Sequence, residues 1–162
     1  MAITKQKKEE ILSKVRSIVA GAKTIVFVNF HLLTVAEERD VRAALRAENV
    51  GYTVAKKTLI RKALDEKGFT GEMPSLDGEV ALAYASDEIA PARAIAAFVK
   101  KYPEHIGMLG GIFAGAYVDK AGITSIAAIP GMDALRAQFV QLINSPRQRF
   151  AVVLNAKADK GE

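Results

Sequence analysis

Four short runs of β-branched and aromatic residues, separated by amphipathic segments of helical length, constrain the fold more than any other feature of the sequence. The first run, residues 24–30, reads Thr-Ile-Val-Phe-Val-Asn-Phe, which is typical of a strand. We expect further strands at residues 52–55 and 79–85, and a fourth at residues 106–118. Glycines interrupt the fourth run, and glycine inside a strand marks a bend or a bulge. We therefore predict one irregular strand there.

The segments between these runs carry apolar residues at helical spacing. Thr34 and Glu37 form a capping box at the start of the second segment, and Pro91 suits the first turn of the fourth. Thr4 is expected to cap the first helix, and Gly68 to end the third. The predicted helices cover residues 4–20, 34–48, 56–67, 91–102 and 119–128.

The alternation of strands and helices favours an α/β (α+β) fold, in which helices pack on one mixed or antiparallel sheet. A ferredoxin-like sheet with an extra helix between its middle strands fits this order best. The parallel strand pairs that it needs have helix-length crossovers available. Pro130 and Gly131 end the globular part, so we expect a globular domain at residues 1–130. Residues 131–162 are expected to form a C-terminal helical appendage, helical over residues 132–158 with an interruption at Pro146.

Composition excludes several classes of protein. The chain has 162 residues, of which 50% are hydrophobic, so one domain with an appendage is a natural expectation. It has no cysteine, which excludes disulfides and thiolate metal sites. The first ten residues carry charges with no apolar stretch behind them, and no run approaches the roughly 18 apolar residues of a membrane span. We therefore expect an intracellular, cytoplasmic protein.

Signs of an active site are weak. His31 and His105 stand at strand-end or turn positions, where we expect them to be ordinary surface or turn residues. Residues 21–24 (Gly-Ala-Lys-Thr) superficially resemble the end of a phosphate loop, but they lack the earlier glycine and precede a strand. A helix C-cap explains them better. We predict no enzyme, no metal site and no cofactor.

Two segments, the first 20 residues and the third predicted helix, concentrate positive charge, in a chain with 23 Lys and Arg against 18 Asp and Glu. In the third predicted helix, Lys57 and Arg61 lie four residues apart on one face, and Leu59, Ala63 and Leu64 take much of the other. Such a face either contacts phosphates or is simply a solvated charged face. Because no pair of strands is rich in aromatic residues, recognition of RNA by shape and backbone is the expected mode. The candidate RNA-binding residues are Lys7, Lys8, Lys56, Lys57, Thr58, Arg61 and Lys62.

The segment after Gly131 contains an internal repeat. Residues 139–144 (Phe-Val-Gln-Leu-Ile-Asn) match residues 150–155 (Phe-Ala-Val-Val-Leu-Asn) at an offset of 11 residues. Eleven residues are close to three helical turns, so both copies face the same way if the helix continues. The apolar face either folds back on the core or docks partner helices, and its duplication favours partners. The candidate partner-binding residues are Leu135, Phe139, Leu142, Ile143, Phe150, Val153 and Leu154.

Several segments match one known family in their order along essentially the whole chain. The most specific is Val-Ala-Lys-Lys-Thr-Leu-Ile-Arg-Lys-Ala at residues 54–63, with Phe-His-Leu-Leu-Thr-Val-Ala-Glu-Glu at residues 30–38. The others lie at residues 41–46, 78–82, 90–98, 110–111 and 126–130. Together they resemble the stalk-base protein family of the large ribosomal subunit, ribosomal protein ten of bacterial type. Lys57 stands where this family usually has asparagine, so any contact that needs an amide is lost.

The resemblance implies a globular domain that binds large-subunit ribosomal RNA near the neighbouring stalk-base protein, ribosomal protein eleven. It also implies that the C-terminal helix holds dimers of the acidic stalk protein, ribosomal protein seven/twelve, which recruit translation factors. The two copies of the repeat predict two dimers. One alternative is an α/β enzyme acting on a phosphorylated substrate, which would need a pocket with perturbed acids or bases. The other is a free RNA-binding regulator, against which the duplicated tail argues.

Overall fold

The structure is a computed structural model that describes residues 5–159. Thr4, the expected cap of the first helix, lies outside the described residues. The chain divides into two compact units, Met1–Ile129 and Pro130–Glu162. Along the chain, the elements are α1 (Lys5–Gly21), β1 (Thr24–Phe30), α2 (Val35–Ala47), β2 (Gly51–Val54), α3 (Lys57–Lys67), β3 (Glu79–Ala85), α4 (Ala90–Lys101), β4 (Ile106–Phe113), β5 (Ala116–Asp119), α5 (Lys120–Ala127) and α6 (Met132–Asp159).

The five strands form one sheet in the order β2-β3-β1-β4-β5, and all neighbouring strands are antiparallel. This confirms the α/β fold with helices layered on one sheet. The first four strands have the order of a ferredoxin-like sheet, with α3 inserted between β2 and β3. Strands that run parallel, such as β1 with β2 and β3 with β4, are separated by at least one intervening strand, so no named strands pair in parallel.

Alternating residues of the central strand β1 divide the core into two layers, as the period of a strand requires. Ile25 and Phe27 belong to the cluster formed with α1 and α3 on one face of the sheet. Val26 and Val28 belong to the cluster formed with α2, α4 and α5 on the other face. Helices therefore cover both faces, and the predicted basic segments, α1 and α3, share one of them.

The fourth predicted strand, over residues 106–118, is wrong in one respect, because it is two strands. The chain reverses between β4 and β5 at Ala114 and Gly115, whose φ angles are 49° and 83°. Two successive positive φ angles suit a tight hairpin turn, but alanine rarely adopts them and so gave no sign of a turn. The expected bulge is present, with Leu109 as the extra residue where the pairing of β4 with β1 shifts.

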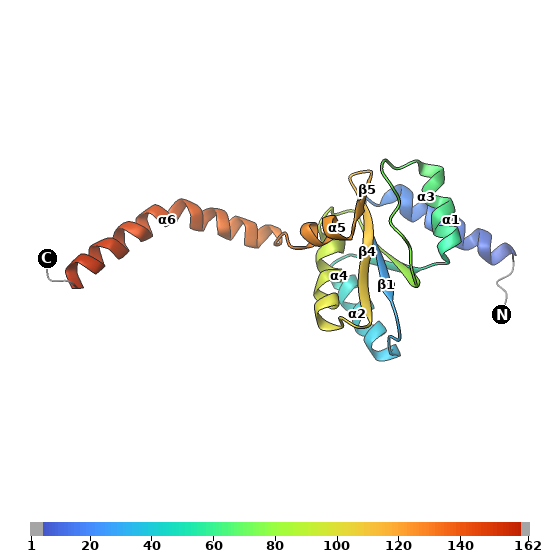
Figure 1. Ribbon diagram of the computed structural model, residues 1–162, viewed down its shortest axis with the longest axis horizontal. Helices are drawn as coiled ribbons and strands as arrows, with labels where there is room; N and C mark the ends of the chain where they lie inside the picture. The colour runs from blue at the N-terminus through green and yellow to red at the C-terminus, as the bar shows by residue number, and fades with distance from the viewer. Residues whose placement is uncertain (1–4, 160–162) are drawn as a thin grey trace. The chain divides into compact units, whose positions relative to one another are not determined.

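The predicted interruption of the last helix at Pro146 is also wrong. Helix α6 runs as one curved helix from Met132 to Asp159 with Pro146 inside it (Figure 1). Proline lacks the amide that would bond to the carbonyl of Leu142, four residues earlier. The hydroxyl of Ser145 donates to that carbonyl oxygen instead, at 2.9 Å. This replacement bond helps to explain why the helix continues.

Candidate functional site

Helices α1 and α3, which carry the two basic segments, lie side by side on the sheet (Figure 1). The guanidinium of Arg16 on α1 donates two hydrogen bonds of 2.6 Å to the carboxylate of Glu66 on α3. The ammonium of Lys67 donates to the backbone carbonyl of Val19 at 2.5 Å. These contacts tie the two helices together.

The orientation of α3 follows from its apolar residues. Ile60, Ala63 and Leu64 are buried, while Leu59, which we placed in the apolar face, is only partly buried. The helix ends at Gly68 in the left-handed conformation, as predicted, and no side chain caps its start at Lys56. The apolar face therefore turns the basic side chains of α3 outward.

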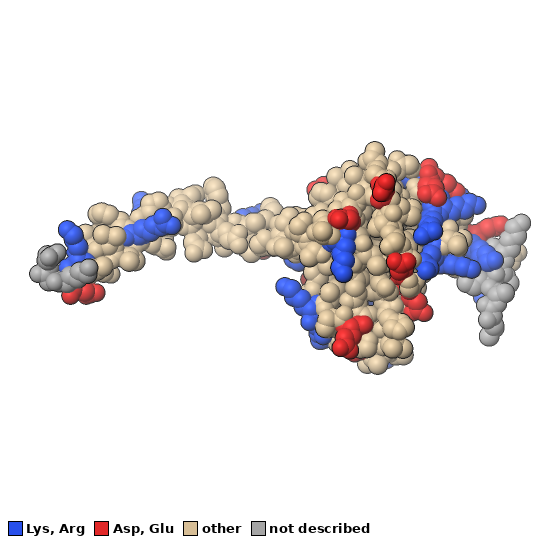
Figure 2. Space-filling view, viewed as in Figure 1, with Lys and Arg blue, Asp and Glu red and all other residues tan. Residues whose placement is uncertain are grey.

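The candidate RNA-binding residues are all exposed. Figure 2 shows that lysine and arginine side chains gather over α1 and α3, at the right of the view. Among residues 5–159, none of these candidates forms an ion pair, in contrast to Arg16. We call this set the α1–α3 basic surface, and it consists of Lys7, Lys8, Lys56, Lys57, Thr58, Arg61 and Lys62.

A second group of basic residues, beside strand β2, was not among the predicted site residues. Lys14, Arg42 and Arg46 help to line a hollow of about 300 Å³ at this edge of the sheet. Arg42 also pairs with Glu38 at 2.7 Å and lies 5.3 Å from the centre of the Tyr52 ring. Burial raises the pKa of Tyr52 to about 12. The spacing of Arg42 and Arg46, four residues apart on a predicted helix, was the signal that could have identified them.

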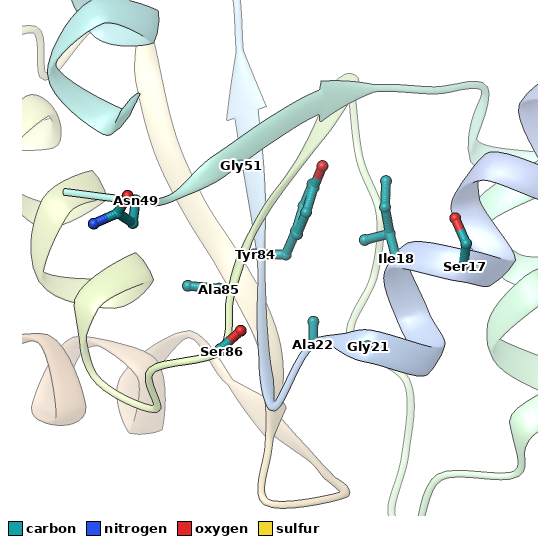
Figure 3. A pocket seen from close by; sticks show the side chains of 9 residues that line it. All are labelled: Ser17, Ile18, Gly21, Ala22, Asn49, Gly51, Tyr84, Ala85 and Ser86. Carbon is teal, nitrogen blue, oxygen red and sulfur yellow. The ribbon is translucent and has the colours of Figure 1, made fainter. Parts of the chain in front are cut away.

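The hollow drawn in Figure 3 is lined by no carboxylate, histidine or lysine. It measures about 290 Å³ and lies between the end of α1 and strands β2 and β3. The ring of Tyr84 stands between Ile18 and Gly51, where a Cβ on Gly51 would meet it at 2.4 Å. The other lining residues are Ser17, Gly21, Ala22, Asn49, Ala85 and Ser86. No acid, histidine or lysine is among them.

The carboxylates with perturbed pKa values have structural roles. Hydrogen bonds from the backbone and hydroxyl of Thr34 lower the pKa of Glu37, in the predicted capping box. The hydrogen bonds from Arg16 lower the pKa of Glu66. Neither Glu37 nor Glu66 lines the hollow beside β2 or the hollow in Figure 3.

The two histidines contact each other, although the sequence placed them apart. The amide of His31 donates to the carbonyl of His105 at 2.8 Å, and a ring nitrogen of His105 lies 3.1 Å from the carbonyl oxygen of His31. These bonds join the end of β1 to the turn before β4. Within residues 5–159, no three acidic or histidine side chains are placed to hold a metal ion, and no helix has the length and apolarity to cross a membrane.

Helix α6 presents large hydrophobic side chains to solvent. None of its described residues is buried, and Leu135 is partly buried. The two copies of the repeat are exposed to a similar extent, since Phe139 is 64% exposed and Phe150 is 67% exposed. We call the following residues the α6 apolar face: Leu135, Phe139, Leu142, Ile143, Phe150, Val153 and Leu154.

Comparison with known proteins identifies the family. The family model described as Ribosomal protein L10 matches residues 3–100. The large ribosomal subunit protein uL10 of Rhodospirillum rubrum is 33% identical over 96% of this chain and 90% of its own length. That of Paracidovorax citrulli is 34% identical over 100% of this chain and 96% of its own length. The chain belongs to the ribosomal protein L10 family.

Membership of the L10 family confirms the resemblance noted in the sequence. The chain is a structural protein of the large ribosomal subunit, located on the ribosome in the cytoplasm, and it is not an enzyme. The family model ends at residue 100, whereas the match to uL10 of Delftia acidovorans covers 99% of the chain at 33% identity. The similarity to curated relatives therefore includes α6.

Proposed function

We propose that the globular unit binds large-subunit ribosomal RNA through the α1–α3 basic surface. The support is a set of exposed cations that the fold leaves without acidic partners among the described residues, on a member of a ribosomal family. Phosphate contacts release counterions from RNA, so each unpaired Lys or Arg adds to affinity in a salt-dependent way. The ion pair of Arg16 removes that residue from this role.

The start of α3 suits a phosphate group. Its first amides have no side-chain cap, and the positive end of a helix dipole attracts anions. Lys56 and Lys57 stand at this end, and the hydroxyl of Thr58 in the first turn can donate to a phosphate oxygen. Lys57, in place of the usual asparagine, contributes charge rather than the paired donor and acceptor of an amide.

We also propose that α6 anchors dimers of the acidic stalk protein, and its exposed repeated face is the observation that carries this proposal. Because α6 is continuous, an offset of 11 residues places the two copies about 16 Å apart along the helix and about 20° apart around it. Each copy offers three or so large side chains, and burying one is worth roughly 1.5–3 kcal/mol before association costs. One copy is therefore sufficient for one dimer.

The charges of α6 fit an acidic partner. Its acids are Asp133 and Asp159, and Asp133 is already paired with Arg136 at 3.2 Å. The other basic residues, Arg147, Arg149 and Lys157, flank the second copy of the repeat. Cations at the rim of an apolar contact speed association with an acidic protein and favour it over a basic one.

Together these contacts make the chain the base of the ribosomal stalk. The globular unit is held on RNA, next to the neighbouring stalk-base protein, ribosomal protein eleven. Helix α6 holds the acidic proteins, which in turn recruit translation factors.

Purification of the tagged chain from cells tests the proposal. We expect it to travel with large ribosomal subunits and a small acidic protein. A chain that ends at residue 129 is the matched control, which should retain the ribosome and lose the acidic protein. Absence of ribosomal RNA from both preparations would reject the RNA-binding role.

A further inference from the structure

A hollow at the start of α3 is lined by apolar residues together with two lysines and one glutamate. Its volume is about 420 Å³, within the range of roughly 300–1,000 Å³ typical of small-molecule sites. Phe30 at the end of β1 and Val54 at the end of β2 contribute to its walls, and Lys56 and Lys57 stand where the chain enters α3. We call it the α3 hollow, and its lining consists of Phe30, Val54, Ala55, Lys56, Lys57, Gly78, Glu79 and Val80.

The walls of the α3 hollow suit a flat aromatic group. Phe30 is partly buried, so its ring is held in place but remains accessible. Val54, at the end of the edge strand β2, is 44% exposed. A nucleobase that stacks on Phe30 and covers Val54 would remove this apolar surface from water.

The α3 hollow carries charges of both signs. Glu79, the register partner of Phe30, is the one acid in the lining, and its exposed carboxylate can accept hydrogen bonds from a bound group. A base offers N–H groups to such a carboxylate, and guanine presents two neighbouring ones. The phosphates of the same nucleotide strand then meet Lys56 and Lys57, which also line the hollow.

We propose that the α3 hollow receives one unstacked nucleobase, preferably guanine, of the RNA that the α1–α3 basic surface holds. This inference rests on the proposed RNA binding and extends it, because the sequence alone indicated recognition by shape and backbone. An extruded base read in this way gives the contact sequence preference, which phosphate contacts do not supply.

The first experiment titrates the full-length chain with guanosine 5′-monophosphate and, separately, with inorganic phosphate, observed by NMR. The proposal expects the nucleotide to shift the resonances of Phe30 and Val54 as well as those of Lys56 and Lys57. Inorganic phosphate should shift only the two lysines. If the nucleotide also leaves Phe30 and Val54 unmoved, the hollow does not take a base and the proposal is overturned. This arm needs no ribosomal RNA, so it remains informative if the RNA-binding proposal fails.

The second experiment measures binding of purified large-subunit ribosomal RNA by two matched pairs of variants. Phe30→Leu removes the stacking ring, and Phe98→Leu is its control, because Phe98 packs against the same core cluster but does not line the hollow. Val54→Gln alters the wall at an exposed position, and Val35→Gln is the control at a residue that is 69% exposed outside the hollow. Because Val54 and Val35 are both exposed, this second pair keeps the test valid if Phe30→Leu impairs folding.

We expect Phe30→Leu and Val54→Gln to weaken RNA binding by about fivefold to tenfold, the loss of one base contact. The dependence of affinity on salt should not change, because no cation is removed. The RNA affinities of the two controls should stay within about twofold of that of the unmodified chain. This change is smaller than the one expected when a base contact is lost. Equal affinities for all four variants would overturn the proposal even if the RNA binds tightly. If the hollow instead receives an apolar side chain of a neighbouring protein, all four variants should likewise bind RNA alone with equal affinity.

Discussion

Ser145 donates its hydroxyl hydrogen to the carbonyl oxygen of Leu142 across 2.9 Å, in the turn where Pro146 has no amide to offer. The bond supplies a donor to a carbonyl that would otherwise have none in the helix. It also places both copies of the repeat on one continuous helix. Pro146 itself falls on the same side of the helix as the α6 apolar face, between the two copies.

The Ser145 bond predicts how the middle of α6 responds to substitution. Pro146→Ala restores the missing amide and removes a residue that costs a helix interior about 3 kcal/mol, so it should slow hydrogen exchange of the amides that follow it. Ser145→Ala removes the replacement donor and should make the same amides exchange faster. Exchange rates in the full chain measure both effects. Unchanged exchange in Ser145→Ala would show that the hydroxyl does not support the helix.

Removing the cations of α3 should flatten the salt dependence of RNA binding. Alanine at Lys56, Lys57, Arg61 and Lys62 together is expected to lower the slope of log affinity against log salt by about 0.7–0.9 for each charge that meets a phosphate. Filter binding of large-subunit ribosomal RNA at several salt concentrations gives the slope. Lys100→Ala with Lys120→Ala, on helices of the other face, is the control and should change little.

Deleting residues 130–162 should leave a folded globular unit. The sheet and both core clusters lie within Met1–Ile129, so the truncated chain is expected to unfold cooperatively near the melting temperature of the full chain. Differential scanning calorimetry checks this. Loss of a cooperative transition would place α6 in the core and refute the boundary.

The ion pair between Arg16 and Glu66 predicts a pH-dependent stability. The folded pKa of Glu66 lies below its usual value of 4.5, so its contribution is present above that value and is lost as the pH falls through the folded pKa. Glu66→Gln should therefore lower the melting temperature at about pH 7 and lose this difference towards about pH 3. Glu72→Gln, at an exposed acid outside any described ion pair, is the control. A difference that persists unchanged at low pH would contradict the assignment.

Local patterns predicted most of the fold. The bounds of β1 and β3 and the capping box at Thr34 match the structure, because strand composition and cap chemistry are properties of neighbouring residues. The turn at Ala114 was missed, since it depends on pairing that forces an alanine into a positive φ angle. The continuity of α6 was missed because proline usually interrupts a helix, and the bond from Ser145 to the carbonyl of Leu142 is not evident from the sequence.

The candidate site was predictable as a set of charges but not as a surface. The sequence indicated that Lys57 and Arg61 share a face, but it could not indicate whether Arg16 and Lys67, in the same two segments, are free to meet a partner. Only the packing of α1 against α3 shows that these two bind Glu66 and Val19 instead. The α3 hollow was not predictable, because Phe30 and Val54 come from strands that are not neighbours in the sheet.

We propose above all that this chain is a stalk base whose α6 holds two dimers of an acidic protein. Native mass spectrometry of the complex purified through the tagged chain tests it most directly. The account predicts one copy of this chain with four acidic subunits, and loss of two of them in Phe150→Asp. Two or six acidic subunits would contradict the count, and their complete absence would contradict the claim itself.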